Sequence, residues 1–208
     1  MKPAATSLIT TLSFLLWLSF TTTKPLTSQA SASEQVLDIN GDPIFPGREY
    51  YFVSATWGPL CGGPKPERTG DSSSCSYSVI LERFDVMLGE PIRVRVPGIS
   101  TGTISVGSFN AEIEFVKEPT GCADSSKLVI GGSKDHPQWS LVNGAFKIDQ
   151  MGGLGYKLVF CTRFNFQASN SCYGVGIKYQ DGKKHLVLKE TEDESPFRVL
   201  FMKKDRVW

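Results

Sequence analysis

Short runs of alternating apolar and polar residues recur along the chain, and this pattern limits the possible folds more than any other feature. Residues 92–96 (IRVRV) and 111–115 (AEIEF) alternate strictly, as half-buried strands do. No segment keeps the 3.6-residue period of a helix over three turns. The sequence therefore predicts an all-β barrel or sandwich in a single domain, with strands at residues 50–57, 76–81, 92–96, 111–115, 139–142, 146–148, 156–161, 175–179, 185–188 and 197–202.

Turn-forming residues separate these strands. Asn143-Gly144 and Asp181-Gly182 are both dipeptides that favour two-residue hairpin turns. The second lies in the middle of residues 177–187, where apolar and polar residues alternate on both sides of the turn. We expect a β-hairpin there.

The N-terminal segment has the features of a secretory signal. Lys2 supplies positive charge, and residues 8–20 (LITTLSFLLWLSF) form an apolar run that is too short to span a bilayer. We expect residues 1–30 to be a signal peptide, cleaved between about residues 23 and 33; the alternative is a buried N-terminal helix. The rest of the chain, residues 31–208, has no apolar run of about 18 residues. It is therefore expected to be exported, to the extracellular space or the vacuole, and not to lie in a membrane.

The charge balance argues against a nucleic-acid partner. The chain has 22 basic and 21 acidic residues, for a net charge of +1. Lys2 and Lys24 lie before residue 31, so the expected mature chain keeps 20 basic residues against 21 acidic ones, a net charge of −1. No basic surplus remains to neutralise phosphates, and no nucleic-acid binding is expected.

Export would place the five cysteines in an oxidising compartment, where four would pair and one would be left over. Five choices of the odd cysteine with three pairings each allow 15 arrangements. No C-x-x-C motif is present, which argues against a zinc or thioredoxin-like site. The two histidines, His136 and His185, lie in no recognisable motif, so neither a metal site nor a cysteine–histidine pair is expected.

The sequence offers no convincing catalytic set. The glycine-rich residues 152–157 lack the spacing of a phosphate loop and precede a strand, so a hairpin loop is the better interpretation. No G-x-S-x-G motif occurs. An acidic run between two expected strands is typical of a solvated turn; it consists of Glu190, Glu192, Asp193 and Glu194. We therefore expect a binding protein that acts through its loops, without enzymatic activity or a cofactor.

Residues 36–44 (VLDINGDPI), followed by Tyr50-Tyr51, form a distinctive motif near the start of the expected mature chain. This motif resembles the opening signature of the plant Kunitz (soybean trypsin inhibitor) family, although Phe52 stands where an aliphatic residue is usual. Further matches lie at residues 75–79, 112–115, 129–132, 139, 146–148, 156–161 (YKLVFC), 174–177 and 196–201. The resemblance covers about residues 35–204, essentially the whole mature chain.

The resemblance implies a β-trefoil, in which six strands form a short barrel closed by three hairpins. It also implies two disulfides, Cys75–Cys122 and Cys161–Cys172, and leaves Cys61 unpaired. A buried Cys61 would act as a small apolar residue, whereas an exposed one would be able to join two chains. We expect a monomer, with a covalent dimer through Cys61 as the alternative.

The resemblance further implies inhibition of an endopeptidase through a rigid, substrate-like loop. That loop falls within residues 97–106, and its expected protease contacts are Pro97, Gly98, Ile99, Ser100, Thr101, Gly102 and Thr103. The residue that enters the specificity pocket of the protease, called P1, is expected to be Thr101, with Arg95 as the second candidate. A serine protease is the expected target; cysteine and aspartic proteases are the alternatives.

Three departures from the inhibitor pattern argue against strong trypsin inhibition. Gly98, Gly102 and Gly107 give the loop more conformational freedom than a preorganised inhibitor loop would have. Residues 96–116 contain neither lysine nor arginine, so the carboxylate of a trypsin-type pocket would find no cation there. The asparagine that supports the loop in typical inhibitors aligns with Pro46, which has no amide to donate. A small P1 would instead suit the neutral pockets of elastase-like or subtilisin-like enzymes. The alternative function is a non-inhibitory trefoil that binds a small molecule, pigment or carbohydrate, or that serves in storage or defence.

Overall fold

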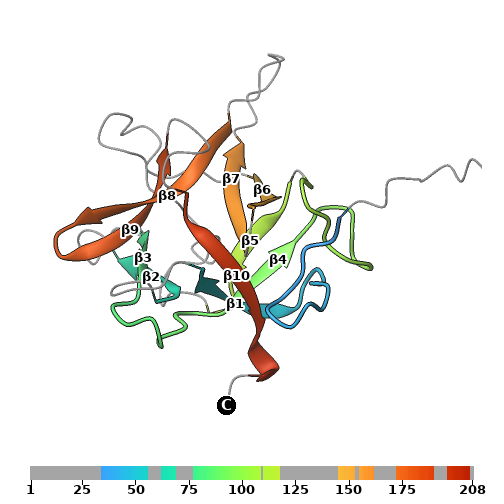
Figure 1. Cartoon of the computed structure of the whole chain (residues 1–208), viewed down its shortest axis with the longest axis horizontal. Coiled ribbons are helices and arrows are strands. Elements are labelled where there is room, and N and C mark those ends of the chain that lie inside the picture. The colour runs from blue at the N-terminus through green and yellow to red at the C-terminus, as the bar shows by residue number, and fades with distance from the viewer. Residues whose placement is uncertain are drawn as a thin grey trace, which may run out of the picture. The chain divides into compact units, whose positions relative to one another are not determined.

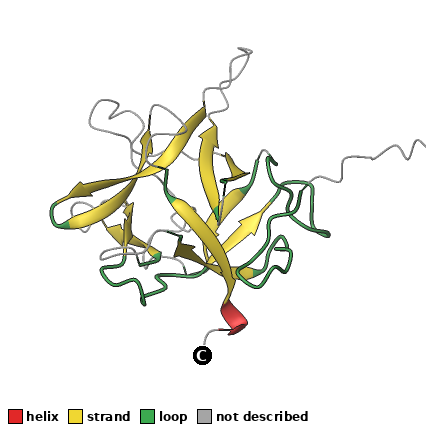
Figure 2. Cartoon of the chain, in the orientation of Figure 1, coloured by secondary structure: helices red, strands yellow, loops and turns green. Residues whose placement is uncertain are grey.

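The computed structural model describes residues 34–55, 62–68, 77–108, 110–117, 145–152, 155–161, 172–189 and 196–206. These residues form ten β-strands and one short 3₁₀ turn, η2 (Lys204–Arg206). The strands are β1 (Glu49–Ser54), β2 (Pro64–Arg68), β3 (Tyr77–Leu81), β4 (Ile92–Arg95), β5 (Glu112–Phe115), β6 (Ala145–Gln150), β7 (Tyr156–Cys161), β8 (Cys172–Gln180), β9 (Lys183–Lys189) and β10 (Arg198–Lys203). Nearly all of the regular structure is therefore strand, as the alternating pattern predicts (Figure 2).

Six of the strands close into a ring. The order β7-β10-β1-β4-β5 is hydrogen-bonded throughout, and β6 pairs with β7. The remaining gap is bridged where Ala111, immediately before β5, exchanges two backbone hydrogen bonds of 2.9 and 2.8 Å with Phe146 of β6. This ring is the six-stranded barrel of the predicted β-trefoil; its strands are labelled in Figure 1, where β10 crosses in front.

The strands outside the ring form two antiparallel hairpins, β2–β3 and β8–β9. In the second, Gln180 pairs with Lys183 across the Asp181-Gly182 turn, which confirms the hairpin predicted from that dipeptide. The strand predicted at residues 139–142 lies outside the described residues.

Strand β2 is not among the strands predicted from the sequence, and it contains Pro64 and Pro66, which are unusual in a strand interior. It lies at one end of the sheet order, beside β3 only. Proline removes one ladder donor, and edge strands tolerate that loss.

The barrel interior is filled by alternate side chains of the ring strands. Each strand contributes at least two side chains that are no more than 2% exposed. Aromatic rings pack edge to face there, with centroids 5.3 Å apart for Phe52 and Phe201 and 5.6 Å apart for Phe146 and Phe160. The inward-facing residues are Tyr50 and Phe52, Ile92 and Val94, Ile113 and Phe115, Phe146 and Ile148, Leu158 and Phe160, and Val199 and Phe201.

A disulfide joins Cys161, at the end of β7, to Cys172, at the start of β8. The two residues are paired across the antiparallel strands, with their Cα atoms 4.2 Å apart. This confirms one of the two bridges expected from the family resemblance. Cys75, Cys122, Cys61, the acidic run at residues 190–194 and the expected signal peptide at residues 1–30 lie outside the described residues.

Among the described residues no helix is long and apolar enough to cross a membrane. The same part of the chain brings together no group of His, Cys, Asp and Glu that would hold a metal ion.

Candidate functional site

The connection between β4 and β5 carries the expected contact loop. Its residues 97–102 are all exposed, Thr103 is half-buried, and Ile104 is only 2% exposed. Six of the seven expected contact residues therefore face solvent in one uninterrupted run. The exposed segment is short because buried side chains fix the chain on both sides of it.

The N-terminal end of the exposed segment is a tight turn. The carbonyl oxygen of Val96, which is buried, accepts the N–H of Ile99 at 2.9 Å. Pro97 and Gly98 occupy the two corners, and Gly98 has φ of +82°. Proline followed by a residue with positive φ is the arrangement of a type II turn. The chain thus leaves the barrel strand through a hydrogen-bonded bend.

The C-terminal end is held by a closed ring of three backbone hydrogen bonds. Ile104 donates to the carbonyl of Ile44 at 3.1 Å, Ile44 donates to that of Val36 at 2.9 Å, and Val36 donates back to that of Ile104 at 2.8 Å. All three side chains belong to the hydrophobic core. The C-terminal end of the contact loop is therefore held by the N-terminal segment of the described chain. We call the group formed by Val36, Ile44 and Ile104 the seat of the loop.

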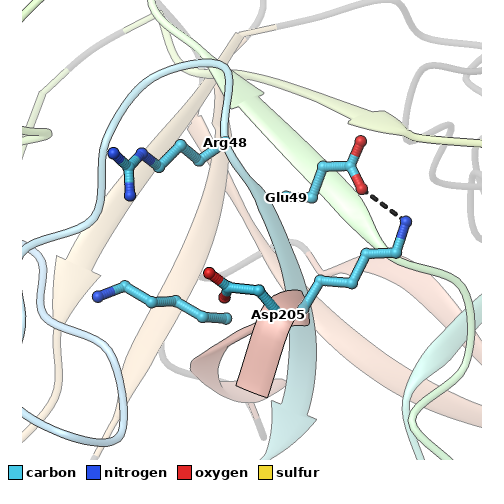
Figure 3. A pocket seen from close by; sticks show the side chains of 5 residues that line it. Arg48, Glu49 and Asp205 are labelled. Atoms are coloured by element: carbon cyan, nitrogen blue, oxygen red, sulfur yellow. Dashed lines mark hydrogen bonds and ion pairs between the residues drawn. The ribbon is translucent and has the colours of Figure 1, made fainter. Parts of the chain in front are cut away.

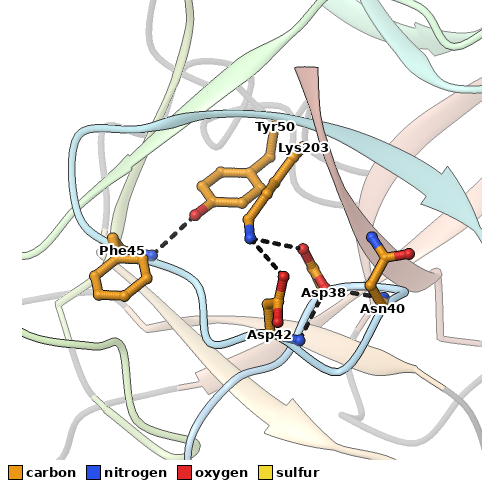
Figure 4. Close-up of polar contacts among 6 residues, drawn as sticks. All are labelled: Asp38, Asn40, Asp42, Phe45, Tyr50 and Lys203. Carbon is orange, nitrogen blue, oxygen red and sulfur yellow. Dashed lines mark hydrogen bonds and ion pairs between the residues drawn. The ribbon is translucent and has the colours of Figure 1, made fainter. Parts of the chain in front are cut away.

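A buried carboxylate shapes that N-terminal segment. Asp38 Oδ1 accepts the N–H groups of Asn40 and Asp42 at 2.8 and 3.0 Å, which folds residues 38–42 into a turn (Figure 4). Lys203 Nζ, from β10, lies 3.4 Å from Asp38 Oδ2 and 2.9 Å from Asp42 Oδ2. The hydrogen bond to Asp42 is the main cause that raises the pKa of Lys203, and the charge of Asp38 adds to it.

Two tyrosine hydroxyls complete the attachment of the segment to the barrel. Tyr156 accepts the N–H of Leu37 at 2.8 Å, and Tyr50 accepts the N–H of Phe45 at 3.0 Å. Both tyrosines belong to ring strands and are themselves buried. The seat of the contact loop is thus tied to the barrel by side-chain acceptors as well as by backbone bonds.

Charged side chains line an open hollow beside this segment. The hollow is bordered by Arg48, Glu49, Lys203, Lys204 and Asp205 (Figure 3). Glu49 accepts from Lys204 at 2.6 Å and from Arg93 at 2.9 Å. The Lys204 hydrogen bond is the first cause of the lowered pKa of Glu49. Within this set the ion pair between Lys204 and Glu49 links η2 to β1, and Lys203 forms its ion pairs with Asp38 and Asp42, so these charges serve the barrel end.

The second P1 candidate, Arg95, lies on the outside of β4. Its backbone pairs with Glu112 of β5, and its side chain, 54% exposed, lies with Nε 3.2 Å from Glu114 Oε2. A protease takes up its substrate as a free extended strand, and the backbone of Arg95 is already engaged. The exposed segment whose backbone is outside the strand ladder therefore begins only after Val96.

Pro46, at the position that the family resemblance assigns to the supporting asparagine, lies in the turn before β1. The next residue, Gly47, donates its N–H to the carbonyl of Val94 on β4 at 2.8 Å, so this turn lies beside the strand that leads into the contact loop. A proline side chain has no donor for the loop carbonyls. The loop is supported at its two ends rather than at its centre.

Sequence reasoning missed the seat formed by Val36, Ile44 and Ile104, and the link from Asp38 to Lys203. The turn of residues 38–42 has a readable signal, since Asp, Asn and Gly in this order favour such turns. Lys203 lies 161 residues from Asp42, and no local pattern marks that pairing.

Comparisons with known proteins agree on one family. Residues 36–203 match the model of the legume Kunitz family, described as trypsin and protease inhibitors. The Kunitz-type trypsin inhibitor-like 2 protein of Pisum sativum is 40% identical over 206 residues, which cover 92% of this chain and 90% of the relative. Subtilisin inhibitor CLSI-II of Canavalia lineata is 35% identical over 184 residues, 80% of this chain and 90% of the relative. The crystal structure of a Kunitz-type trypsin inhibitor from Cicer arietinum, 38% identical, superposes with a TM-score of 0.67 over 82% of this chain and 98% of that one.

Proposed function

This chain belongs to the Kunitz family of plant protease inhibitors, and we propose that its exposed residues 97–102 enter the active-site cleft of a serine endopeptidase. The observation that carries this proposal is a six-residue exposed segment fixed at both ends. A hydrogen-bonded turn holds one end, and the ring of three backbone bonds holds the other. A segment that is already ordered loses little conformational entropy on binding, which favours tight inhibition.

The proposed target is a protease with a shallow, neutral specificity pocket. Residues 97–102 carry only apolar and hydroxyl side chains. A trypsin-type pocket would bury its carboxylate without a partner, at a cost of about 1–3 kcal/mol or more. Since about 1.4 kcal/mol corresponds to a tenfold change in affinity, trypsin is disfavoured by one to two orders of magnitude. Elastase-like and subtilisin-like enzymes impose no such cost, and a relative named as a subtilisin inhibitor supports this choice.

A panel of inhibition constants tests the proposal. The mature protein is titrated against subtilisin, pancreatic elastase, chymotrypsin and trypsin, and the expected result is inhibition of subtilisin or elastase at least about tenfold tighter than of trypsin. Ile99→Arg, in the contact loop, should weaken that inhibition. The matched control is Tyr179→Arg, which changes an exposed apolar side chain on β8, away from the loop, and should leave inhibition unchanged.

Failure to inhibit any enzyme of the panel would contradict the proposal and favour a non-inhibitory trefoil. In that case absorbance of the purified protein and binding of carbohydrates would be examined. Equal loss of inhibition in the Ile99→Arg and Tyr179→Arg variants would show that the contact surface lies elsewhere.

The proposal includes export and the absence of an enzymatic activity of the chain itself. We propose that residues 1–30 direct the chain into the secretory pathway, toward the extracellular space or the vacuole, and that Cys75–Cys122 forms there. Intact mass and non-reducing peptide mapping of the protein purified from plant tissue would test both points. Retention of residues 1–30, or a Cys61–Cys75 bridge, would contradict them.

A further inference from the structure

We infer that the reactive bond of the inhibitor is the peptide bond between Ser100 and Thr101. Ser100 would then be the P1 residue, with Ile99 before it at position P2 and Thr101 after it at position P1′. This inference rests on the proposed function and names the bond that the protease attacks. It moves the P1 position one residue toward the N-terminus from Thr101, the residue that the sequence alone favours.

The backbone of the contact loop carries the argument. A serine protease holds its substrate as an extended strand, in which φ is negative on both sides of the scissile bond. Gly98 has φ of +82° and Gly102 has φ of +100°. In the described residues positive φ occurs outside glycine only at Asn110 and Asp181, so residues 99–101 all have negative φ. The stretch with a substrate-like backbone is therefore three residues long.

Three registers place the P1 residue within residues 99–101, and only one of them keeps both neighbours of P1 inside this stretch. With Ile99 at P1, the P2 residue would be Gly98, whose positive φ turns the chain away from an extended strand. With Thr101 at P1, the P1′ residue would be Gly102, which has the same defect. With Ser100 at P1, the residues on both sides of it, Ile99 and Thr101, have negative φ.

Gly98 and Gly102 are required for their backbone conformation and not because a larger side chain would clash with neighbouring atoms. A Cβ atom added at Gly98 or at Gly102 would meet no other atom within 4 Å. Neither glycine therefore serves a close packing contact, and what remains is the left-handed φ that other residues adopt at a cost. Gly98 sits at a corner of the turn closed by the bond from Ile99 to Val96, so straightening it breaks that bond.

The side chains fit this register. Ile99 is 46% exposed and offers an apolar surface at P2. Ser100 is exposed and small, which matches the shallow neutral pocket inferred from the composition of the loop. Hydrolysis of the bond adds one water molecule, leaving a carboxylate on Ser100 and an amino group on Thr101, with no redox change.

Mapping the cut bond is the first test. The mature protein is incubated with a catalytic amount of the protease that it inhibits best, and the fragments are identified by intact mass and N-terminal sequencing. The expected fragment begins at Thr101. Cleavage before Ser100 or before Gly102, with inhibition intact, would overturn this inference and leave the proposed function standing. Absence of inhibition of any protease would overturn both.

A matched pair of substitutions is the second test. A trypsin-type pocket reads the P1 residue, so Ser100→Arg should strengthen trypsin inhibition by about tenfold or more, because the pocket carboxylate gains its partner. Thr101→Arg places the same side chain one residue later and should change trypsin inhibition less than about threefold. A gain with Thr101→Arg and none with Ser100→Arg would overturn the assignment. The thermal unfolding temperature of both variants should equal that of the wild type, since both side chains face solvent.

Discussion

Replacing Ile104 by alanine tests whether the seat of the contact loop is packed as the structure shows. Ile104 is 2% exposed and lies in the hydrophobic core with Val36 and Ile44. The change removes three carbon atoms, worth about 0.8 kcal/mol each for transfer out of water. The unfilled cavity adds to this, so the expected loss in the free energy of unfolding is about 3–4 kcal/mol, within the range known for such changes.

The matched control is Ile99→Ala, the same chemical change five residues earlier. Ile99 is 46% exposed, so its truncation leaves no enclosed cavity and forfeits roughly half of the transfer energy, about 1 kcal/mol. For a chain of this size about 1 kcal/mol lowers the unfolding temperature by about 2–4 °C. We expect a fall of about 6–16 °C for Ile104→Ala and about 2–4 °C for Ile99→Ala, measured by calorimetry or circular dichroism.

The order of the two variants should be reversed for inhibition. Below the unfolding temperature, Ile99→Ala should weaken inhibition more than Ile104→Ala. The first change removes a side chain that contacts the protease, whereas the second only loosens the end of the loop. Equal unfolding temperatures for the two variants would refute the reasoning, because the buried seat would then make no greater contribution than the exposed segment. A loss below about 1 kcal/mol for Ile104→Ala would do the same.

Three further predictions concern the framework. The double variant Cys161→Ser/Cys172→Ser should lose about 3 kcal/mol in the chain-entropy account of a short closed loop, and urea unfolding that matches the wild type would contradict this. The pKa of Lys203 is raised from 10.5 by the hydrogen bond to Asp42, so stability should fall as pH rises above about 10.5 through the raised pKa, and Lys203→Met should flatten that alkaline decline in thermal unfolding. The pKa of Glu49 is lowered from 4.5 by its lysine hydrogen bond, so stability should fall as pH drops below about 4.5 toward the lowered pKa. Glu49→Gln should flatten this acid decline, and an unchanged slope would contradict the assignment.

Strands such as β4 and β5 were predictable because their buried and exposed side chains alternate, whereas β7 is buried at most positions and lacks this signal. In β4 the alternation Ile92, Arg93, Val94, Arg95 places two side chains in the core and two outside, and β5 repeats this arrangement opposite it. Burial of one face also fixes the register, since a shift by one residue would exchange the two faces. These two strand predictions rest on this local constraint. The trefoil itself came from the family resemblance, because alternation does not say which strands are neighbours.

The support of the contact loop could not be predicted in the same way. Ile104 lies in a stretch of small and hydroxyl residues. Its partners Val36 and Ile44 lie about 60 to 70 residues earlier, near the N-terminal end of the described chain. The backbone groups that join them carry no residue-specific signal. The C-terminal limit of the exposed loop follows from these contacts and was equally out of reach, as were the φ values of Gly98 and Gly102 that favour Ser100 over Thr101.

The structure separates the residues that determine stability from those that determine specificity. Residues 97–102 face solvent, whereas Val96 and Ile104 on either side are buried in the core. Surface substitutions usually change stability by less than about 0.5 kcal/mol, and even Ile99→Ala is expected to cost only about 1 kcal/mol, so the exposed side chains can change without unfolding the barrel. Relatives that match most of this chain are named as a trypsin inhibitor-like protein and as a subtilisin inhibitor. The two glycines are the exception, since Gly98 and Gly102 lie in the exposed segment yet set its backbone. Substitutions at residues 99–101 should therefore change which protease is inhibited. The positions on either side, Gly98 and Gly102, have positive φ, which favours glycine.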